Sequence, residues 1–211
     1  MPKQIHTISI LGAGKLGITI AQLALKAGYR VYIAGSGSED KIRLSVSILA
    51  PGAVPTTTEH AAQMGDIVIL ALPLGKYRTI PSRKLKEKLV IDAMNYWWEV
   101  DGNADALKNP QTSTSEIVQQ YLPDARVVKA ISHMGYHHLR DEAQAAGAQN
   151  RKALAIAGNH RSDVEQVSEF IDRLGFDPLP IGELHNGRQL EPGHAAFGAN
   201  LSKDSLASLL L

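Results

Sequence analysis

The chain has 211 residues, a net charge of +1 and 20% charged residues, without the basic excess or stripe that nucleic-acid-binding proteins carry. It contains no cysteine, which excludes disulfides, thiolate zinc sites and cysteine nucleophiles together and is compatible with a reducing, cytoplasmic location. No segment reaches the roughly 18 apolar residues that a membrane-spanning helix requires, so we expect no membrane partner. The apolar N-terminus is interrupted by glycines and lacks a cleavage site, so we expect it to be the first structural unit.

Short apolar runs recur along the chain and predict strands that are buried on both faces. Several are nearly continuous in Val, Ile, Leu and Ala, a pattern that is typical of a parallel sheet covered by helices. The predicted strands are 5–11, 30–34, 66–72, 88–93, 125–131, 152–158 and 176–181, with a weak short strand near 54–57.

Segments with helical character separate the strands. Residues 15–28 repeat apolar side chains at helical spacing. Segments 112–122 and 162–175 begin near Ser113 and Ser162, each followed three residues later by a glutamate, which is the spacing of a capping box. The alternation predicts an α/β fold of the Rossmann type: a doubly wound, mostly parallel sheet of about eight strands, with right-handed crossovers and a short C-terminal extension.

Gly12, Gly14 and Gly17 form a G-x-G-x-x-G motif between the first predicted strand and the first predicted helix. In a dinucleotide-binding loop, Gly12 allows the tight turn, Gly14 lets the backbone approach the pyrophosphate, and Gly17 lets the helix pack closely on the strand. The helix N-terminus, which begins with Lys15 and Leu16, offers N–H groups and a positive dipole end to the phosphates. A plain glycine turn is the alternative interpretation.

The second predicted strand ends without the acidic residue that binds the ribose 2′-hydroxyl in NAD-preferring proteins. In its place stand Ser36, Gly37 and Ser38. The two serines can donate hydrogen bonds, and Lys41 and Arg43 can supply positive charge to a 2′-phosphate. The acidic residues 39–40 fall where the next helix should begin, so we interpret them as a helix cap. The sequence therefore predicts NADP rather than NAD as the cofactor.

We expect a dinucleotide-binding Rossmann core in residues 1–135 and, in residues 136–211, a C-terminal extension that continues the sheet. The two together should form one compact unit, since no linker rich in Pro, Gly or Ser divides the chain. The tail at 205–211 is rich in leucine, so we expect it to pack on its own core or on a second subunit.

Several segments make the chain resemble the NADP-dependent oxidoreductases that reduce the deazaflavin coenzyme F-420, and also the cytosolic reductase domain of the six-transmembrane ferric reductases. The segments are ILGAGKLG, the GS that ends the second strand with a lysine five residues after the serine (Ser36 to Lys41), LALP (70–73), DAMNYWWEVDG (92–102), ARVVKAISHMG (125–135), LAIAG (154–158) and EPGHAAFG (191–198). One departure is Gly37, because the family commonly has an arginine there that faces the 2′-phosphate. Lys41 or Arg43 would have to compensate.

The resemblance also implies where the reacting groups lie, at the carboxyl ends of strands where ligands of open α/β sheets bind. It implies that the loop at Leu72 and Pro73 covers the nicotinamide ribose, and that the loop from Ala130 to His133 lies beside the nicotinamide and its hydride acceptor. We expect Asn95 to be a polar contact at the reacting rings and His133 to hydrogen-bond a carbonyl or ring nitrogen of the acceptor. The alternatives are an ordinary loop turn at Pro73 and a structural histidine that caps backbone groups at position 133.

Three aromatic residues, Tyr96, Trp97 and Trp98, follow Asn95. They form either a wall for a flat, flavin-like ring or part of a subunit interface, where Trp and Tyr are enriched. The sequence leaves both interpretations open.

The histidines at 133, 137 and 138 have a spacing that metal ligands use on a helix. Gly135 argues against a regular helix there, and no thiol or well-placed carboxylate completes the set. We therefore predict no metal site.

These observations predict an NADP-dependent oxidoreductase that transfers hydride between nicotinamide and a flavin-like or deazaflavin (F-420) acceptor, and that works as a homodimer. Transfer between two planar cofactors needs mainly stacking and alignment, which a small protein can supply. Two alternatives stay open: an NADP-binding sensor or regulatory module without turnover, and a reductase of a small carbonyl or imine that a dimer partner completes.

Overall fold

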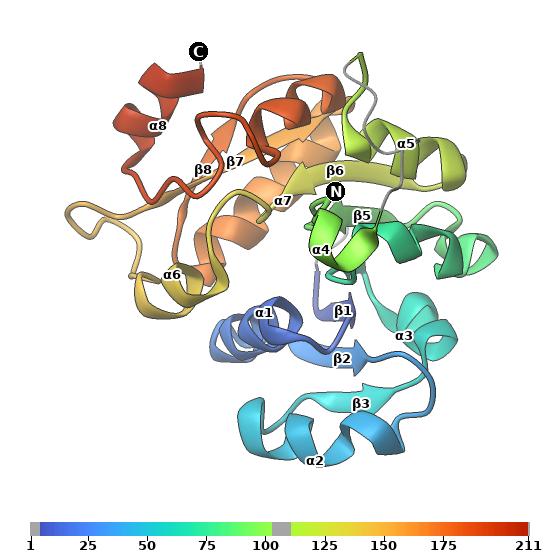
Figure 1. Cartoon of the computed structure of the whole chain (residues 1–211). Coiled ribbons are helices and arrows are strands. Elements are labelled where there is room, and N and C mark those ends of the chain that lie inside the picture. Colours follow the sequence, from blue (N-terminus) through green and yellow to red (C-terminus); the bar gives the residue numbers. More distant parts are fainter. Residues whose placement is uncertain (1–4, 103–110, 211) are drawn as a thin grey trace.

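The computed structural model describes residues 5–102 and 111–210, and these form an α/β fold around one eight-stranded sheet (Figure 1). The strand order is β3-β2-β1-β4-β5-β6-β7-β8, and every neighbouring pair is parallel except β6 with β7. The strands are β1 (Thr7–Leu11), β2 (Arg30–Ala34), β3 (Val54–Thr56), β4 (Ile67–Leu70), β5 (Leu89–Asp92), β6 (Arg126–Ala130), β7 (Ala153–Gly158) and β8 (Asp177–Pro180). The predicted Rossmann-type, mostly parallel sheet is confirmed.

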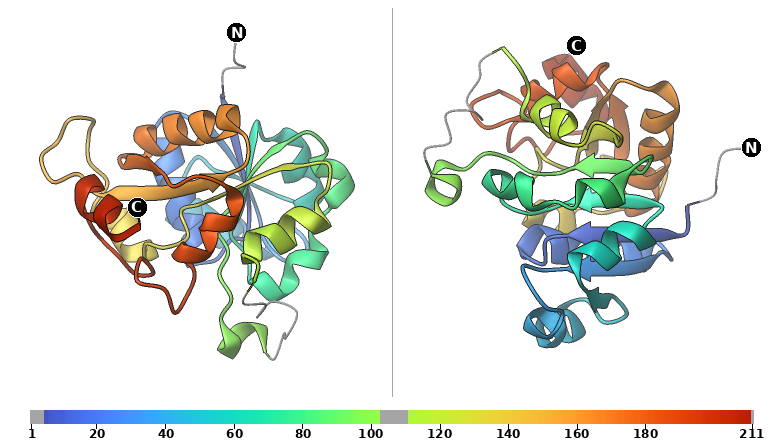
Figure 2. Two further views of the ribbon diagram at one scale, coloured as in Figure 1. Left: turned by 90° about the horizontal axis from the view of Figure 1, so that it is seen from above. Right: turned by 90° about the vertical axis from the view of Figure 1, so that its right-hand side faces the viewer.

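Helices cover both faces of the sheet, as the continuous apolar strands require (Figure 2). One face packs against α1 (Lys15–Lys26), α6 (Tyr136–Asp141) and α7 (Arg161–Leu174). The other packs against α3 (Thr58–Met64), α5 (Thr114–Tyr121) and the 3-10 helices η1 (Leu74–Thr79), η2 (Ser82–Leu85) and η4 (Leu184–Leu190). Within the described residues, the remaining helices are α2 (Asp40–Leu49), α4 (Trp98–Asp101) and α8 (Lys203–Leu210).

The strand order reverses at β1, which lies between β2 and β4. Chain connections leave β1 and β4 toward opposite sides, so a crevice opens between their carboxyl ends. Ligands of open α/β sheets bind at such a switch point. The glycine motif follows β1 directly and therefore lies at this crevice.

Strands β7 and β8 continue the sheet beyond residue 135, and the tail packs on them. Helix α8 contacts both strands, and Leu206 on it is fully buried. Residue 211 of the predicted tail lies outside the described residues. The boundary between a core and an extension at residue 135 stays a prediction. Among the described residues, no helix has the length and apolar character to cross a membrane.

One of the two predicted capping boxes is present. At α5, the Glu116 N–H donates to Ser113 Oγ (3.2 Å) and the Ser113 N–H donates to Glu116 Oε2 (2.7 Å). At α7 the prediction was wrong, because the helix begins one residue before Ser162 and its N-cap is His160. The carboxylate that the box needs, on Glu165, pairs with the Arg161 side chain instead (2.7 Å).

The two serines should therefore differ in their contribution to stability. Ser113→Ala removes a buried cap and a second hydrogen bond to the Leu184 carbonyl, so we expect a loss of about 1–2 kcal/mol in the free energy of unfolding. Ser162→Ala is the matched control and should change it by less than about 0.5 kcal/mol. Urea titrations of both variants measure the difference, and equal losses would contradict the assignment of the caps.

Candidate functional site

The glycine motif combines two positions where no side chain fits with one that opens onto free space. A Cβ added to Gly12, whose φ is +126°, would lie 2.1 Å from the Ala71 carbonyl oxygen. A Cβ on Gly17 would lie 1.8 Å from the Gly12 oxygen, whereas one on Gly14 would meet nothing within 4 Å. The fold itself therefore requires Gly12 and Gly17, while Gly14 leaves room for a ligand to approach the backbone.

A cleft of about 360 Å³ opens beside this loop, at the carboxyl ends of β1, β2 and β4. It brings together five of the residues that the sequence singled out: Gly12, Gly14, Ser36, Leu72 and Pro73. Its wall also includes Thr58, Lys76 and Thr79, which the sequence analysis missed. Their positions in the first turn of α3 and in η1, just after β3 and β4, are the signal that could have found them.

Lys41 lies over the segment that ends β2. Gly37 has φ +97°, and a Cβ added there would be 3.2 Å from the Lys41 ammonium nitrogen. Arg43 instead holds Asp40, with its guanidinium nitrogens 2.9 and 3.2 Å from one carboxylate oxygen. Ser36 and the two residues after it are exposed, so the Lys41 ammonium stands beside an open, uncharged segment.

Lys15 and Leu16 begin α1 next to the loop. The Lys15 side chain turns toward α6, where its ammonium lies 5.5 Å from the centre of the Tyr136 ring. Leu16 packs against the core. Neither side chain lines the cleft, whereas Gly14, the N-cap of α1, does. The N–H groups in the first turn of an α-helix have no partner inside the helix.

Buried polar atoms without partners and one strained backbone position lie together at the carboxyl ends of β5 and β6. The Asn95 side-chain amide donates to the Ser132 carbonyl (2.6 Å), and no described residue pairs with Asn95 Oδ1 or Ser132 Oγ, both of which are buried. Ile131, next to Ala130 at the end of β6, has φ +59°, a strained conformation for a branched side chain. Unpaired buried polar atoms and local strain cluster at functional sites.

His133 directly follows Ser132, but its side chain points into the protein. The residue is 1% exposed, and its Nε2 accepts a hydrogen bond from the Ala155 N–H of β7 (3.1 Å). Burial, partly opposed by a backbone contact with Ala199, lowers the pKa of His133 to about 4. This geometry fits the structural alternative better than a contact to an acceptor.

The histidine spacing does not bring metal ligands together. His133 precedes α6 and His137 lies within it, so the two do not share a helix face. Within the described ranges, no group of three or more His, Asp or Glu side chains has the arrangement of a metal site.

Both tryptophans of the aromatic segment after Asn95 are exposed, Trp97 at 47%. The Trp97 ring meets Phe197 edge to face, with centroids 5.5 Å apart, whereas Trp98 is 67% exposed. Asp101 accepts hydrogen bonds from the N–H groups of Gly75 and Trp97, both at 2.8 Å, and so holds α4 against η1. Phe197 belongs to the EPGHAAFG segment, so two of the segments that carried the resemblance meet here.

Comparison with known proteins agrees with this resemblance. Residues 7–96 match the family model described as NADP oxidoreductase, coenzyme F420-dependent. The rat metalloreductase STEAP3 is 24% identical over 193 residues, which are 90% of this chain and 37% of the relative. Human metalloreductase STEAP2 is 23% identical over 188 residues, 88% of this chain and 35% of that protein. The chain thus spans little more than a third of these curated relatives.

Solved structures share the fold over nearly the whole chain. A hypothetical protein from Sinorhizobium meliloti, SMa0349, superposes with a TM-score of 0.80 at 28% identity, covering 95% of this chain and 97% of the other. A candidate F420-dependent NADP reductase from Arthrobacter sp. FB24 gives 0.73 at 20% identity, covering 88% of each. The predicted resemblance to the F420-dependent NADP oxidoreductases and to the ferric reductases is confirmed.

The buried His133 should make the stability of the protein depend on pH. Its folded pKa, about 4, lies below the ordinary value of 6.5, so between these values the unfolded chain binds more protons and stability falls as the pH falls. From pH 7.5 to pH 5 the loss should be about 2 kcal/mol. Urea titrations should show this part of the loss disappear in His133→Asn and remain in His137→Asn. An unchanged pH dependence in His133→Asn would contradict the assignment.

Proposed function

We propose that the chain is an NADP-dependent oxidoreductase. The cleft at β1, β2 and β4 would hold the adenosine and pyrophosphate of NADPH. The nicotinamide would lie toward the carboxyl ends of β5 and β6, next to a planar hydride acceptor. The match of residues 7–96 to the family model and the predicted motifs support this assignment.

The observation that carries the proposal is the position of Lys41. In the family, an arginine directly after the strand-two serine faces the 2′-phosphate, and this chain has Gly37 there. The Lys41 ammonium lies 3.2 Å from where the first side-chain atom of residue 37 would be, so it supplies a cation beside that position. No carboxylate ends β2 to repel a phosphate.

The residues around the glycine loop fit the rest of such a cofactor. Gly14 leaves the space that a pyrophosphate needs, and the first-turn N–H groups of α1 favour an anion. Leu72 and Pro73 line the cleft on the side that leads toward the nicotinamide. Asn95 Oδ1 and Ser132 Oγ have no partner in the described part of the chain, and they lie at the end where the reacting ring would be. Bound NADPH would supply the hydride, while these residues bind, orient and exclude water.

A flavin-like or deazaflavin acceptor suits the remaining surface. The Trp97 and Phe197 rings form an aromatic corner near the Asn95 loop, on which a flat ring can stack. A carbonyl or imine reductase would instead need a titrating group near the nicotinamide. The His133 ring is buried and engaged with the Ala155 N–H, so it does not supply one. Transfer between two cofactors is therefore the reaction we favour.

A homodimer and a cytoplasmic location remain predictions. The exposed side chains of Trp98 (67%) and Val100 (66%) are compatible with a subunit contact.

The cofactor assignment predicts a selective loss in Lys41→Ala. This variant should bind NADPH about tenfold more weakly and NADH with unchanged affinity, because only NADPH carries the 2′-phosphate. Arg43→Ala is the matched control, since Arg43 already pairs with Asp40. Fluorescence titrations with both cofactors measure the effect. If Lys41→Ala weakens both cofactors alike, Lys41 is not the phosphate contact.

The acceptor assignment is tested by offering F-420, FMN, FAD and a panel of small carbonyls and imines in turn, while NADPH oxidation is followed. We expect turnover with a flavin or deazaflavin. Trp97→Ala should raise the KM for that acceptor about two- to tenfold, the loss of one stacking contact, while Trp98→Ala leaves it unchanged. Gly14→Val should fold, because a Cβ at position 14 meets nothing within 4 Å. It should bind no NADPH, because its side chain would occupy the space that the pyrophosphate needs. Tight NADPH binding by the parent protein without oxidation by any acceptor would instead indicate a sensor.

A further inference from the structure

Lys129 is a fully buried lysine in a strand that is otherwise apolar in its buried part. It lies on β6, has no exposed surface, and is among the largest fully buried side chains of the protein. Its ammonium lies 3.5 Å from Asp92 Oδ2 and donates to the Met94 carbonyl at 2.5 Å. Neither the cofactor cleft nor the aromatic corner includes it. The proposed reaction therefore leaves this group unexplained.

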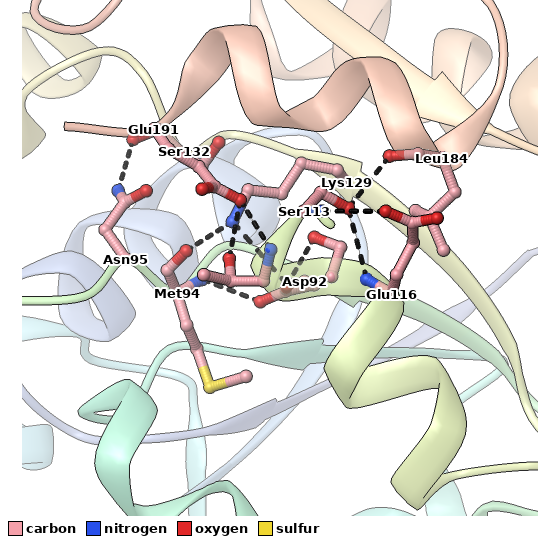
Figure 3. A network of polar contacts seen from close by, with 11 residues as sticks. Asp92, Met94, Asn95, Ser113, Glu116, Lys129, Ser132, Leu184 and Glu191 are labelled. Atoms are coloured by element: carbon pink, nitrogen blue, oxygen red, sulfur yellow. Dashed lines mark hydrogen bonds and ion pairs between the residues drawn. The ribbon is translucent and has the colours of Figure 1, made fainter. Parts of the chain in front are cut away.

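The two charged side chains together hold both peptide groups of one residue (Figure 3). Asp92 Oδ1 accepts a hydrogen bond from the Met94 N–H (2.9 Å), while Lys129 binds the Met94 carbonyl. Asp92 is itself held by the Ser115 hydroxyl at the start of α5 (2.6 Å). Met94 therefore cannot rotate either of its peptide planes without breaking a buried, charged hydrogen bond.

The residue that follows this clamp is Asn95. Its side-chain amide reaches across to the Ser132 carbonyl, beyond the strained Ile131, and its Oδ1 has no partner among the described residues. The ion pair on β5 and β6 thus sets where the Asn95 loop begins. The hydrogen bond to Ser132 sets where the Asn95 side chain points.

The rest of the fold makes room for this pair and keeps water away from it. A Cβ added to Gly187 in η4 would lie 3.0 Å from both Cβ and Cγ of Lys129, so η4 packs directly on the lysine stem. A buried ion pair is weak as a source of stability, since apolar residues of similar volume often serve as well. Its geometric effect, the fixed Met94 peptides, is the property that apolar residues cannot reproduce.

We propose that Lys129 and Asp92 are positioning residues, which clamp the Met94 peptides so that Asn95 stands at the nicotinamide end of the cofactor cleft. Lys129 touches no cofactor itself, because it has no exposed surface. The consequence for binding rests on the proposed NADP site, whereas the clamp on the loop does not.

The test uses a variant in which the pair is neutral, so that no unpaired charge is left buried. In Asp92→Asn/Lys129→Met, the asparagine still accepts from the Met94 N–H, but the Met94 carbonyl loses its donor. Ser115→Ala is the matched control, because it removes a hydrogen bond to Asp92 without touching either Met94 peptide.

Hydrogen–deuterium exchange of the whole protein measures directly whether the clamp holds the backbone at residues 93–96. In the neutral variant, we expect amides in residues 93–96 to exchange about tenfold faster, while those of β5 and β6 keep their protection. Ser115→Ala should exchange like the parent. Unchanged exchange at 93–96, or faster exchange spread evenly through β5 and β6, would overturn the proposal.

The positioning role is tested by comparing the affinity for NADPH with the affinity for 2′,5′-ADP, which lacks the nicotinamide. The neutral variant should bind NADPH about three- to tenfold more weakly and 2′,5′-ADP normally. Asn95→Ala should show the same loss, and combining the changes should add nothing further, because both act through one contact. Additive losses, or equal weakening of both ligands, would overturn the positioning role. If the parent protein binds neither ligand, the proposed NADP site fails, and the exchange result alone decides the clamp.

Discussion

The backbone contact at the glycine loop is the constraint on which the cleft depends. Side-chain atoms on Gly12 or Gly17 would lie within about 2 Å of backbone oxygens, so β1, α1 and the chain after β4 approach one another more closely than side chains allow. This approach places the N-terminus of α1 at the switch point of the sheet. The free N–H groups and the positive end of the helix dipole then face the cleft. Gly14, which lines the cleft, leaves space for a ligand to approach the loop backbone.

The other end of the site depends on contacts between distant parts of the sequence. Glu191 accepts hydrogen bonds from the N–H and hydroxyl of Thr114, at 2.7 and 2.8 Å, and the Gly198 N–H donates to the His133 carbonyl at 2.7 Å. The Trp97 contact with Phe197 joins the same segments. The carboxyl ends of β5 and β6 are thus closed by residues from the last part of the chain, so this end of the site requires the C-terminal segment to be packed in place.

The cationic side chains near the cleft have different interaction partners. Arg43 is held by Asp40, three residues earlier on the same helix, and Lys15 is drawn to the Tyr136 ring. Lys41 remains beside the uncharged end of β2, where we propose that it contacts the 2′-phosphate. Lys129 is enclosed with Asp92 and serves the backbone of a neighbouring loop. Residues of one chemical type therefore have different partners in the fold.

The sequence by itself determined the features that short-range patterns encode: the parallel sheet, the three glycines, the uncharged end of β2 and the cap at Ser113. Apolar periodicity, turn geometry and capping all act within a few residues, so each can be recognised without knowing the neighbours in space. Only the tertiary structure decided that Lys41 covers Gly37, that His133 faces the backbone of β7, and that Lys129 is buried. Each of these depends on which segments pack together from elsewhere in the chain, and burial and pairing are properties of that packing rather than of residue type.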